Sequence, residues 1–274
     1  MPKFPEFSLL SDAPVPDYHL TAQAAHCFHT DPFLYWHYYV NKSFELPPMS
    51  AHTDFEKLFK YALLVGVDKF KDRVVTNAPI NPKTDKPYGE GTDKFNAWYG
   101  PQKRQGKIPM HPDAYEKLNT MLMSVQAQID SGYLPDMKWV LAQVQQVGPQ
   151  TTAHLGGCNC YAHADGMTAT ELVKVITVLR IEDVDDNVYY ERRLREAAYY
   201  LQFQAAVMSK QAIIGNSAYA IVVELSEPHR AFLAKVYTDK AALDKIEEEV
   251  MILNKAYEKP EMWQSKYHST LYIS

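Results

Sequence analysis

The stretch His154-Leu-Gly-Gly-Cys-Asn-Cys-Tyr-Ala-His163 holds two of the three cysteines and two of the ten histidines of the chain. Two adjacent glycines interrupt it, and the segments on both sides have the apolar spacing of helices. We therefore predict a Cys/His loop over residues 151–167 that joins two helices. The third cysteine, Cys27, also lies beside histidines, which are His26 and His29.

Two thiols and two imidazoles within one loop are enough to form a tetrahedral zinc site. Zinc sites more often contain cysteine pairs separated by two to four residues, so the Cys-x-Cys spacing is a weaker signal. The alternative, which we favour, is that the thiols are buried as small apolar groups and no cofactor is bound. The candidate ligands are His154, Cys158, Cys160 and His163, with Cys27, His26 and His29 as further candidates.

A catalytic role is the second interpretation of this loop. Cys158 would be a nucleophile, His163 or His154 its base, and the two glycine amides an oxyanion site. The next predicted helix begins near Ala169, which is too far away to lower the pKa of the thiol. A carboxylate-bridged iron or manganese site would need Glu-x-x-His on two helices, and this spacing does not occur in the chain. We therefore expect no catalytic residues, with Cys158 and His163 as the alternative.

Two other polar groups have simple structural interpretations. Asp165 and Glu171 could orient a histidine, but a turn residue and a helix-capping residue explain them more simply. The arginines at 192, 193 and 195 could bind an acidic ligand. We expect them instead to form a solvated helix face, because the glutamates at 191 and 196 flank them and balance their charge.

Composition limits the class of protein. With 274 residues and 46% hydrophobic content, the chain can form a packed core. The formal charge of −5 comes from interspersed charges, which argues against nucleic acid or an anionic membrane as the main partner. We find neither a secretory signal nor a run of about 20 apolar residues that could span a membrane. An odd, small number of cysteines predicts an intracellular, reducing compartment.

Most of the chain has helical patterning. Thr30-Asp31-Pro32 is a strong helix start, with a capping carboxylate followed by proline at the first helical position. Thr168-x-x-Glu171 matches a capping box and predicts another start. Residues 218–225 could be strand or helix, and Pro228 is expected to restart a helix. The apolar spacing predicts helices over 33–44, 55–70, 112–129, 135–147, 172–179, 188–214 and 241–257.

Three segments differ from this helical pattern. Residues 1–22 carry four prolines between aromatic residues, which predicts an extended N-terminal arm. Residues 76–110 contain nine prolines and glycines, which predicts a long irregular loop. The tail at 260–274 is too aromatic for a solvated terminus.

We therefore predict a mainly α fold, with residues 23–274 as a single irregular multi-helix domain and at most a short strand pair. Three apolar appendages on one chain are typical of interfaces with other proteins. The predicted function is a non-catalytic structural or accessory subunit of a larger assembly, a homo- or hetero-oligomer without nucleic acid. The alternative is a zinc- or thiol-dependent enzyme, with its site at 154–163 and the long loop as a lid.

Overall fold

A computed structural model describes residues 19–43, 54–178 and 187–259. The aromatic tail and all of the predicted N-terminal arm except residues 19–22 lie outside the described residues. The described residues form an α/β fold, with strands in four sheets, the largest of which has five strands. The prediction of a mainly α fold with at most one strand pair is therefore wrong.

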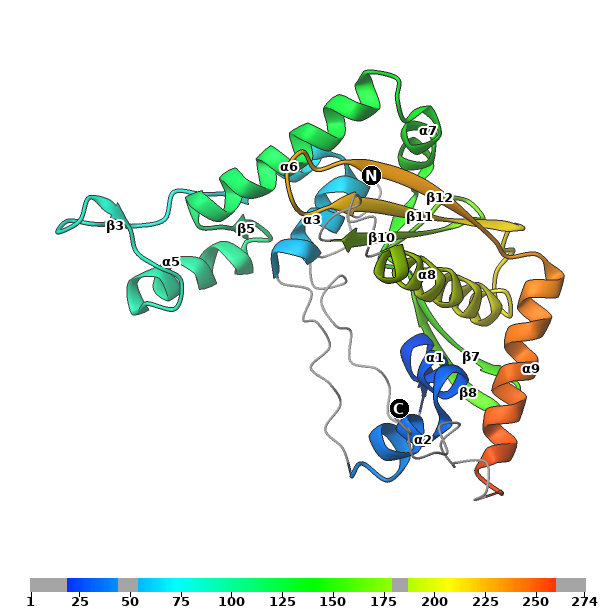
Figure 1. Cartoon of the computed structure of the whole chain (residues 1–274). Helices are drawn as coiled ribbons and strands as arrows, with labels where there is room; N and C mark the ends of the chain where they lie inside the picture. Colours follow the sequence, from blue (N-terminus) through cyan, green and yellow to red (C-terminus); the bar gives the residue numbers. More distant parts are fainter. Residues whose placement is uncertain (1–18, 44–53, 179–186, 260–274) are drawn as a thin grey trace, which may run out of the picture.

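The five-stranded sheet has the order β12-β11-β10-β9-β6. These strands are β6 (Gln146–Val147), β9 (Gly166–Met167), β10 (Leu172–Val178), β11 (Ser217–Glu224) and β12 (Ala231–Tyr237). Only β10 and β11 pair in parallel within this sheet, and the long helix α8 (Asn187–Met208) is the crossover between them. Figure 1 shows α8 lying beside these strands.

Two predicted helices are strands of this sheet. The segment predicted as helix 172–179 is β10, because its β-branched residues are buried on both faces and form a continuous apolar run. Such a run gives no periodic signal that separates strand from helix. Pro228 lies in the turn before β12 and does not restart a helix. The undecided segment 218–225 is strand β11.

The Cys/His stretch is a β-hairpin, so the predicted loop over 151–167 is wrong. Strand β7 (Gln150–Leu155) pairs with β8 (Cys158–His163), and β8 pairs in parallel with β1 (Leu20–Thr21). The turn between β7 and β8 is Gly156-Gly157, with φ of 55° and 87°. Positive φ at both positions is the geometry of a two-residue hairpin turn that matches the twist of the strands.

Helices cover the five-stranded sheet and the three-stranded sheet that β1, β8 and β7 form. Helix α8 packs against β7, β8 and β10, with α1 (Ala22–Thr30) and α9 (Lys240–Ala256) beside it. A second core lies on the other side of β10 and contains α3 (Asp54–Val65), α4 (Val67–Lys71), α6 (Pro112–Asp130) and α7 (Pro135–Gln143). Alternation along β10 fits this arrangement, because Val173 and Val175 belong to the second core whereas Leu172 belongs to the first.

The predicted helix start at Asp31 is confirmed. Its side chain accepts hydrogen bonds from the amides of Phe33 and Leu34 and caps α2 (Pro32–Tyr35). The helix continues as a π-helical turn, η2 (Trp36–Val40). The predicted helices beginning at Pro112 and Pro135 are also present, but the second ends at Gln143 and not at Val147, because Gln146–Val147 form strand β6. None of the described helices is long and apolar enough to cross a membrane.

Residues 74–111 form a projection that extends away from the body of the molecule (Figure 1). It contains the short strands β2 (Val74–Val75), β3 (Ile80–Asn81), β4 (Lys86–Pro87) and β5 (Ile108–Pro109). It also contains a helix of 12 residues, α5 (Asp93–Arg104), capped by the Thr92 hydroxyl. The prediction of an irregular loop over 76–110 is therefore wrong for α5, which forms despite Pro101 within it.

Candidate functional site

The hairpin divides the four residues proposed as zinc ligands between two faces. Successive residues of a strand point to opposite sides, so Cys158 and Cys160 share one face while His163 lies on the other. His154 pairs with Asn159 across the ladder and therefore shares the face of His163. The described residues contain no group of three or more histidine, cysteine or acidic side chains placed to hold a metal ion. The structure does not bring these ligands together.

All three thiols lie in one apolar cluster formed by α1, α8, α9 and the hairpin. Burial, followed by the charge of Asp31, raises the pKa of Cys27 to about 11. Burial also raises the pKa of Cys158, and that of Cys160 to about 12. A nucleophilic cysteine needs a lowered pKa, so the environment of Cys158 opposes that role.

The two histidines beside Cys27 have aromatic partners. The ring centroids of His26 and Tyr199 are 5.0 Å apart, and His29 stacks on Tyr199 with centroids 5.5 Å apart. The Nδ1 atom of His29 also lies 3.4 Å from a carboxylate oxygen of Glu249. These contacts place His26 against α8, and His29 against α8 and α9.

The structure reveals a different polar site, built around Asp165. This residue lies between β8 and β9, next to β10, and its Oδ2 accepts a hydrogen bond of 2.8 Å from the Val175 amide. Lys60 extends from α3 and places its Nζ 3.8 Å from the same oxygen. Only 6% of the Lys60 side chain and 14% of the Asp165 side chain are exposed, so this ion pair is buried.

The pKa values of the pair are shifted by burial and by neighbouring charges. Burial alone would raise the pKa of Asp165, but Lys60, Lys174 and the Val175 amide stabilise the carboxylate and lower its pKa to about 2. Burial lowers the pKa of Lys60; Asp165 opposes this shift and Lys174 adds to it. The carboxylate is therefore ionised at neutral pH, and Lys60 releases its proton more readily than an exposed lysine does.

Further polar side chains from α3, β10 and α8 surround the pair. Thr177 donates a hydrogen bond of 2.7 Å to Glu56. The Tyr200 hydroxyl donates one of 2.8 Å to Glu196, which also forms an ion pair of 3.1 Å with Arg193. The Nζ atom of Lys174 lies 5.3 Å from the centroid of the Tyr200 ring. We call this set the Asp165 cluster: Glu56, Lys60, Asp165, Lys174, Thr177, Arg193, Glu196 and Tyr200.

Lys174 differs from the other cations of the cluster. Lys60 pairs with Asp165 and Arg193 pairs with Glu196, whereas Lys174 forms no ion pair with another described residue. Its charge acts on Asp165, which already pairs with Lys60, and its Nζ lies over the face of an aromatic ring. This arrangement leaves a cation that can bind an anion.

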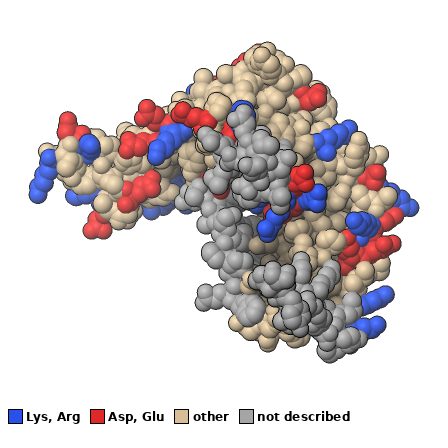
Figure 2. All heavy atoms as spheres, viewed as in Figure 1, with Lys and Arg blue, Asp and Glu red and all other residues tan. Residues whose placement is uncertain are grey.

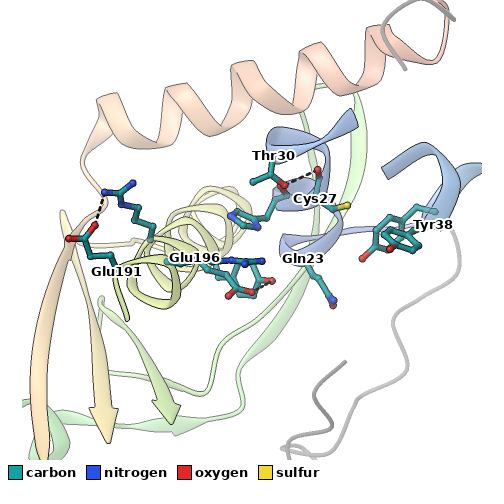
Figure 3. A pocket seen from close by; sticks show the side chains of 11 residues that line it. Gln23, Cys27, Thr30, Tyr38, Glu191 and Glu196 are labelled. Carbon is teal, nitrogen blue, oxygen red and sulfur yellow. Dashed lines mark hydrogen bonds and ion pairs between the residues drawn. The ribbon is translucent and has the colours of Figure 1, made fainter. Parts of the chain in front are cut away.

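A cavity of about 630 Å³ adjoins the cluster, between α1, η2 and α8 (Figure 3). Glu196 and Tyr200 belong to both the cluster and the cavity lining. Figure 3 shows Gln23, Cys27 and Tyr38 on the side of α1 and η2, opposite Glu196 on α8. The remaining lining residues are His26, Thr30, Tyr39, Glu191, Arg192, Arg195 and Tyr200.

From the sequence, Asp165 is explained as a turn residue or as a group that orients a histidine, and neither Lys60 nor Lys174 stands out. One signal was present, because Lys174 is the single charged residue in the buried run of β10. Lys60 likewise lies among buried apolar residues of α3. A lysine is almost never fully buried unless it has a partner, so both positions indicated a polar site.

No protein family model and no curated protein matches the chain. Among solved structures, a "Putative exonuclease" from Eubacterium rectale is similar with 11% sequence identity and a TM-score of 0.47, over 89% of this chain and 80% of that one. The protein SSO0001 is similar with 12% identity and a TM-score of 0.27, over 39% of this chain and 50% of that one. Neither TM-score reaches 0.5, so no function is inferred from them.

Proposed function

We propose that this protein is an enzyme whose substrate carries a phosphate or a similarly compact anion, bound by Lys174 at the Asp165 cluster. The observation that carries this proposal is the buried Lys60–Asp165 pair beside a lysine that has no ion-pair partner among the described residues. Groups with shifted pKa values beside a cavity are typical of catalytic sites, although structural ion pairs also produce such shifts.

Each charged group has a role in this proposal. Lys174 binds the anionic group of the substrate. Lys60 is the group that exchanges a proton with the substrate: its ammonium form donates the proton and the resulting amine takes one back. Its lowered pKa lets it do so nearer neutral pH than an exposed lysine can. Asp165 stays ionised and holds the Lys60 amine in position, since its pKa is about 2.

Calorimetric titration with inorganic phosphate and with methyl phosphate tests the proposal. Wild-type protein should bind both anions, and Lys174→Ala should weaken binding at least about tenfold, a loss of roughly 1.4 kcal/mol. Lys235→Ala is a matched control, because Lys235 also lies over a tyrosine ring, 6.0 Å from the centroid of Tyr237, but on strand β12 outside the cluster. Equal affinities in all three proteins, or no binding by wild type, would contradict the proposal.

We also propose that the protein is a subunit of a larger protein assembly, with the projection as an interface. Charge distribution supports this second candidate. Residues 74–111, the projection, carry six basic and three acidic side chains, a net charge of +3, so the rest of the chain carries −8. Figure 2 shows acidic and basic side chains along the projection. A basic projection suits an acidic protein surface, including the remainder of a second copy.

Light scattering after size-exclusion chromatography, at low and at high salt, tests this second candidate. Assemblies should form at low salt and dissociate at high salt, since the attraction between exposed charges is screened. The double variant Lys103→Glu/Arg104→Glu should prevent assembly, whereas Lys240→Glu on α9 should not. A monomer under all conditions would rule the proposal out. The proposed compartment is intracellular and reducing, which the three free cysteines support.

A further inference from the structure

Aromatic rings from three elements face the cavity beside the Asp165 cluster. His26 comes from α1, Tyr38 and Tyr39 from η2, and Tyr200 from α8. The volume of about 630 Å³ lies within the range of small-molecule sites, which is roughly 300–1,000 Å³. The cavity can therefore hold a planar ring together with its substituents.

The wall formed by α1 and η2 is uncharged at neutral pH. Burial, the largest effect, lowers the pKa of His26, so the imidazole is neutral. Burial raises the pKa of Tyr39 to about 12 and that of Cys27 to about 11. A fully charged ligand would lose hydration in such a space without compensation, whereas a planar aromatic group would gain contacts with the rings.

Charges are restricted to the α8 side of the cavity. Glu191 and Arg195 pair with each other at 3.0 Å, and Glu196 is occupied by Arg193 and Tyr200. Arg192 lines the same side and forms no ion pair with another described residue. This side also adjoins the Asp165 cluster. Arg192 therefore orients a ligand with its anion toward α8 and its ring toward α1 and η2.

The backbone of η2 supports a specialised role for this wall. The amide of Asn41 donates to the carbonyl of Trp36 at 2.7 Å, the i+5 hydrogen bond of a π-helix. Single π-helical turns are rare and are often found at functional sites. Here the turn places two consecutive tyrosines, Tyr38 and Tyr39, on the cavity lining.

We infer that this cavity binds a planar aromatic group, so that the substrate is an aromatic phosphate ester or a comparable aromatic anion. The inference rests on the proposed function, because the Asp165 cluster supplies the site of the anion. It adds the chemical class of the remainder of the substrate.

Calorimetric titration of the full chain with three probes tests the inference. Inorganic phosphate and methyl phosphate lack a ring, and phenyl phosphate has one. Phenyl phosphate should bind at least about fivefold more tightly than methyl phosphate, which is near the middle of the range for one aromatic pair. Tyr39→Ala should reduce this preference to below about twofold.

A second variant covers the possibility that Tyr39→Ala disturbs the fold, because Tyr39 packs against the core. Gln23→Trp places a large side chain in the cavity from a half-buried position of α1. It should remove the preference for phenyl phosphate and leave the affinity for inorganic phosphate unchanged. Tyr237→Ala, at an exposed tyrosine of β12, is the control and should keep the preference.

The outcomes separate the inference from the proposed function. Binding of all three probes with equal affinity would overturn the inference and leave the anion site intact. A preference for phenyl phosphate that persists in both Tyr39→Ala and Gln23→Trp would place the ring elsewhere and would also overturn it. Failure of every probe to bind the wild-type protein would contradict both proposals.

Discussion

The substitution Asp165→Asn should destabilise the protein in a pH-dependent way. It preserves the size of the side chain and an oxygen that can accept the hydrogen bond from Val175, but it removes the negative charge. Lys60 and Lys174 then lie close together without the carboxylate that separates their charges. The cost of the substitution is therefore mainly electrostatic.

The magnitude follows from the pKa of Asp165, which falls from an ordinary 3.8 to about 2 on folding. Because the folded-state value is lowered, the carboxylate contributes its full stabilisation above pH 4 and loses it as the pH falls toward 2. A pKa shift of this size means that the Asp165 carboxylate contributes about 2 kcal/mol to the free energy of unfolding at pH 7. About half of this contribution remains at pH 3. The residue is largely buried, so solvent screening reduces this value little.

Urea denaturation of both proteins at pH 7 and at pH 3 measures the effect. Asp165→Asn should lower the free energy of unfolding by about 2 kcal/mol at pH 7 and by about 1 kcal/mol at pH 3. The control Asp130→Asn removes one partner of an exposed ion pair with Lys138 and should change it by less than about 0.5 kcal/mol. Equal stability of Asp165→Asn and wild type at pH 7, or the same loss at both pH values, would refute the reasoning.

Three other substitutions or treatments test the structure more widely. In urea denaturation, Gly156→Ala should lower the free energy of unfolding by at least about 2 kcal/mol more than Gly91→Ala does. A Cβ at Gly156 would lie 2.8 Å from backbone atoms of α9, whereas Gly91, also at positive φ, faces open space. In the native protein Cys27 should react with iodoacetamide at pH 8 on the order of 100-fold more slowly than in the unfolded chain, since its pKa is about 11. The rates are measured by mass spectrometry of the Cys27 peptide, and equal rates would contradict the prediction. Arg230→Lys should lower the free energy of unfolding by about 3 kcal/mol, because lysine cannot make both 3.0 Å hydrogen bonds to the fully buried Glu224 carboxylate. A loss of less than about 1 kcal/mol would contradict this prediction.

The helices with local start signals could be predicted from the sequence. Asp31 caps α2 and Pro112 begins α6, because a capping side chain or a proline fixes the first turn without help from distant residues. The amphipathic helix α9 was predicted within one or two residues of its observed bounds for the same kind of reason. These elements are determined by residues that lie next to one another in the chain.

The strands could not be predicted as easily, because tertiary packing determines them. The Thr168 hydroxyl accepts a hydrogen bond of 3.0 Å from the Glu171 amide, as in a capping box, but a strand follows this turn. For β10, the feature of the sequence that favours a strand over a helix is the β-branched run from Val173 to Val178. The hairpin carried a stronger signal, because two glycines between two six-residue segments are typical of a tight β-turn.

The candidate site depended on these missed strands. Asp165, Lys60 and Lys174 are far apart in the chain or separated by a turn, and only the sheet brings them together. With β10 interpreted as a helix, Lys174 would fall on a solvated face and need no explanation. The alternation of β10 instead places it on the α8 side of a buried strand, beside Tyr200. A charged residue at such a position then requires either a partner or a function.

The energetics of the buried pair favour a function over a purely structural role. Removing Lys60 and Asp165 from water costs several kcal/mol for each ion, and a well-packed apolar pair at the same place is often as stable or more stable. The contact of 3.8 Å between Nζ and Oδ2 is longer than a good charge-assisted hydrogen bond, so it recovers only part of that cost. A second cation, Lys174, adds repulsion to Lys60 that a stabilising ion pair would not need. A bound anion beside Lys174 would offset this repulsion, and that gain is what would make such binding favourable.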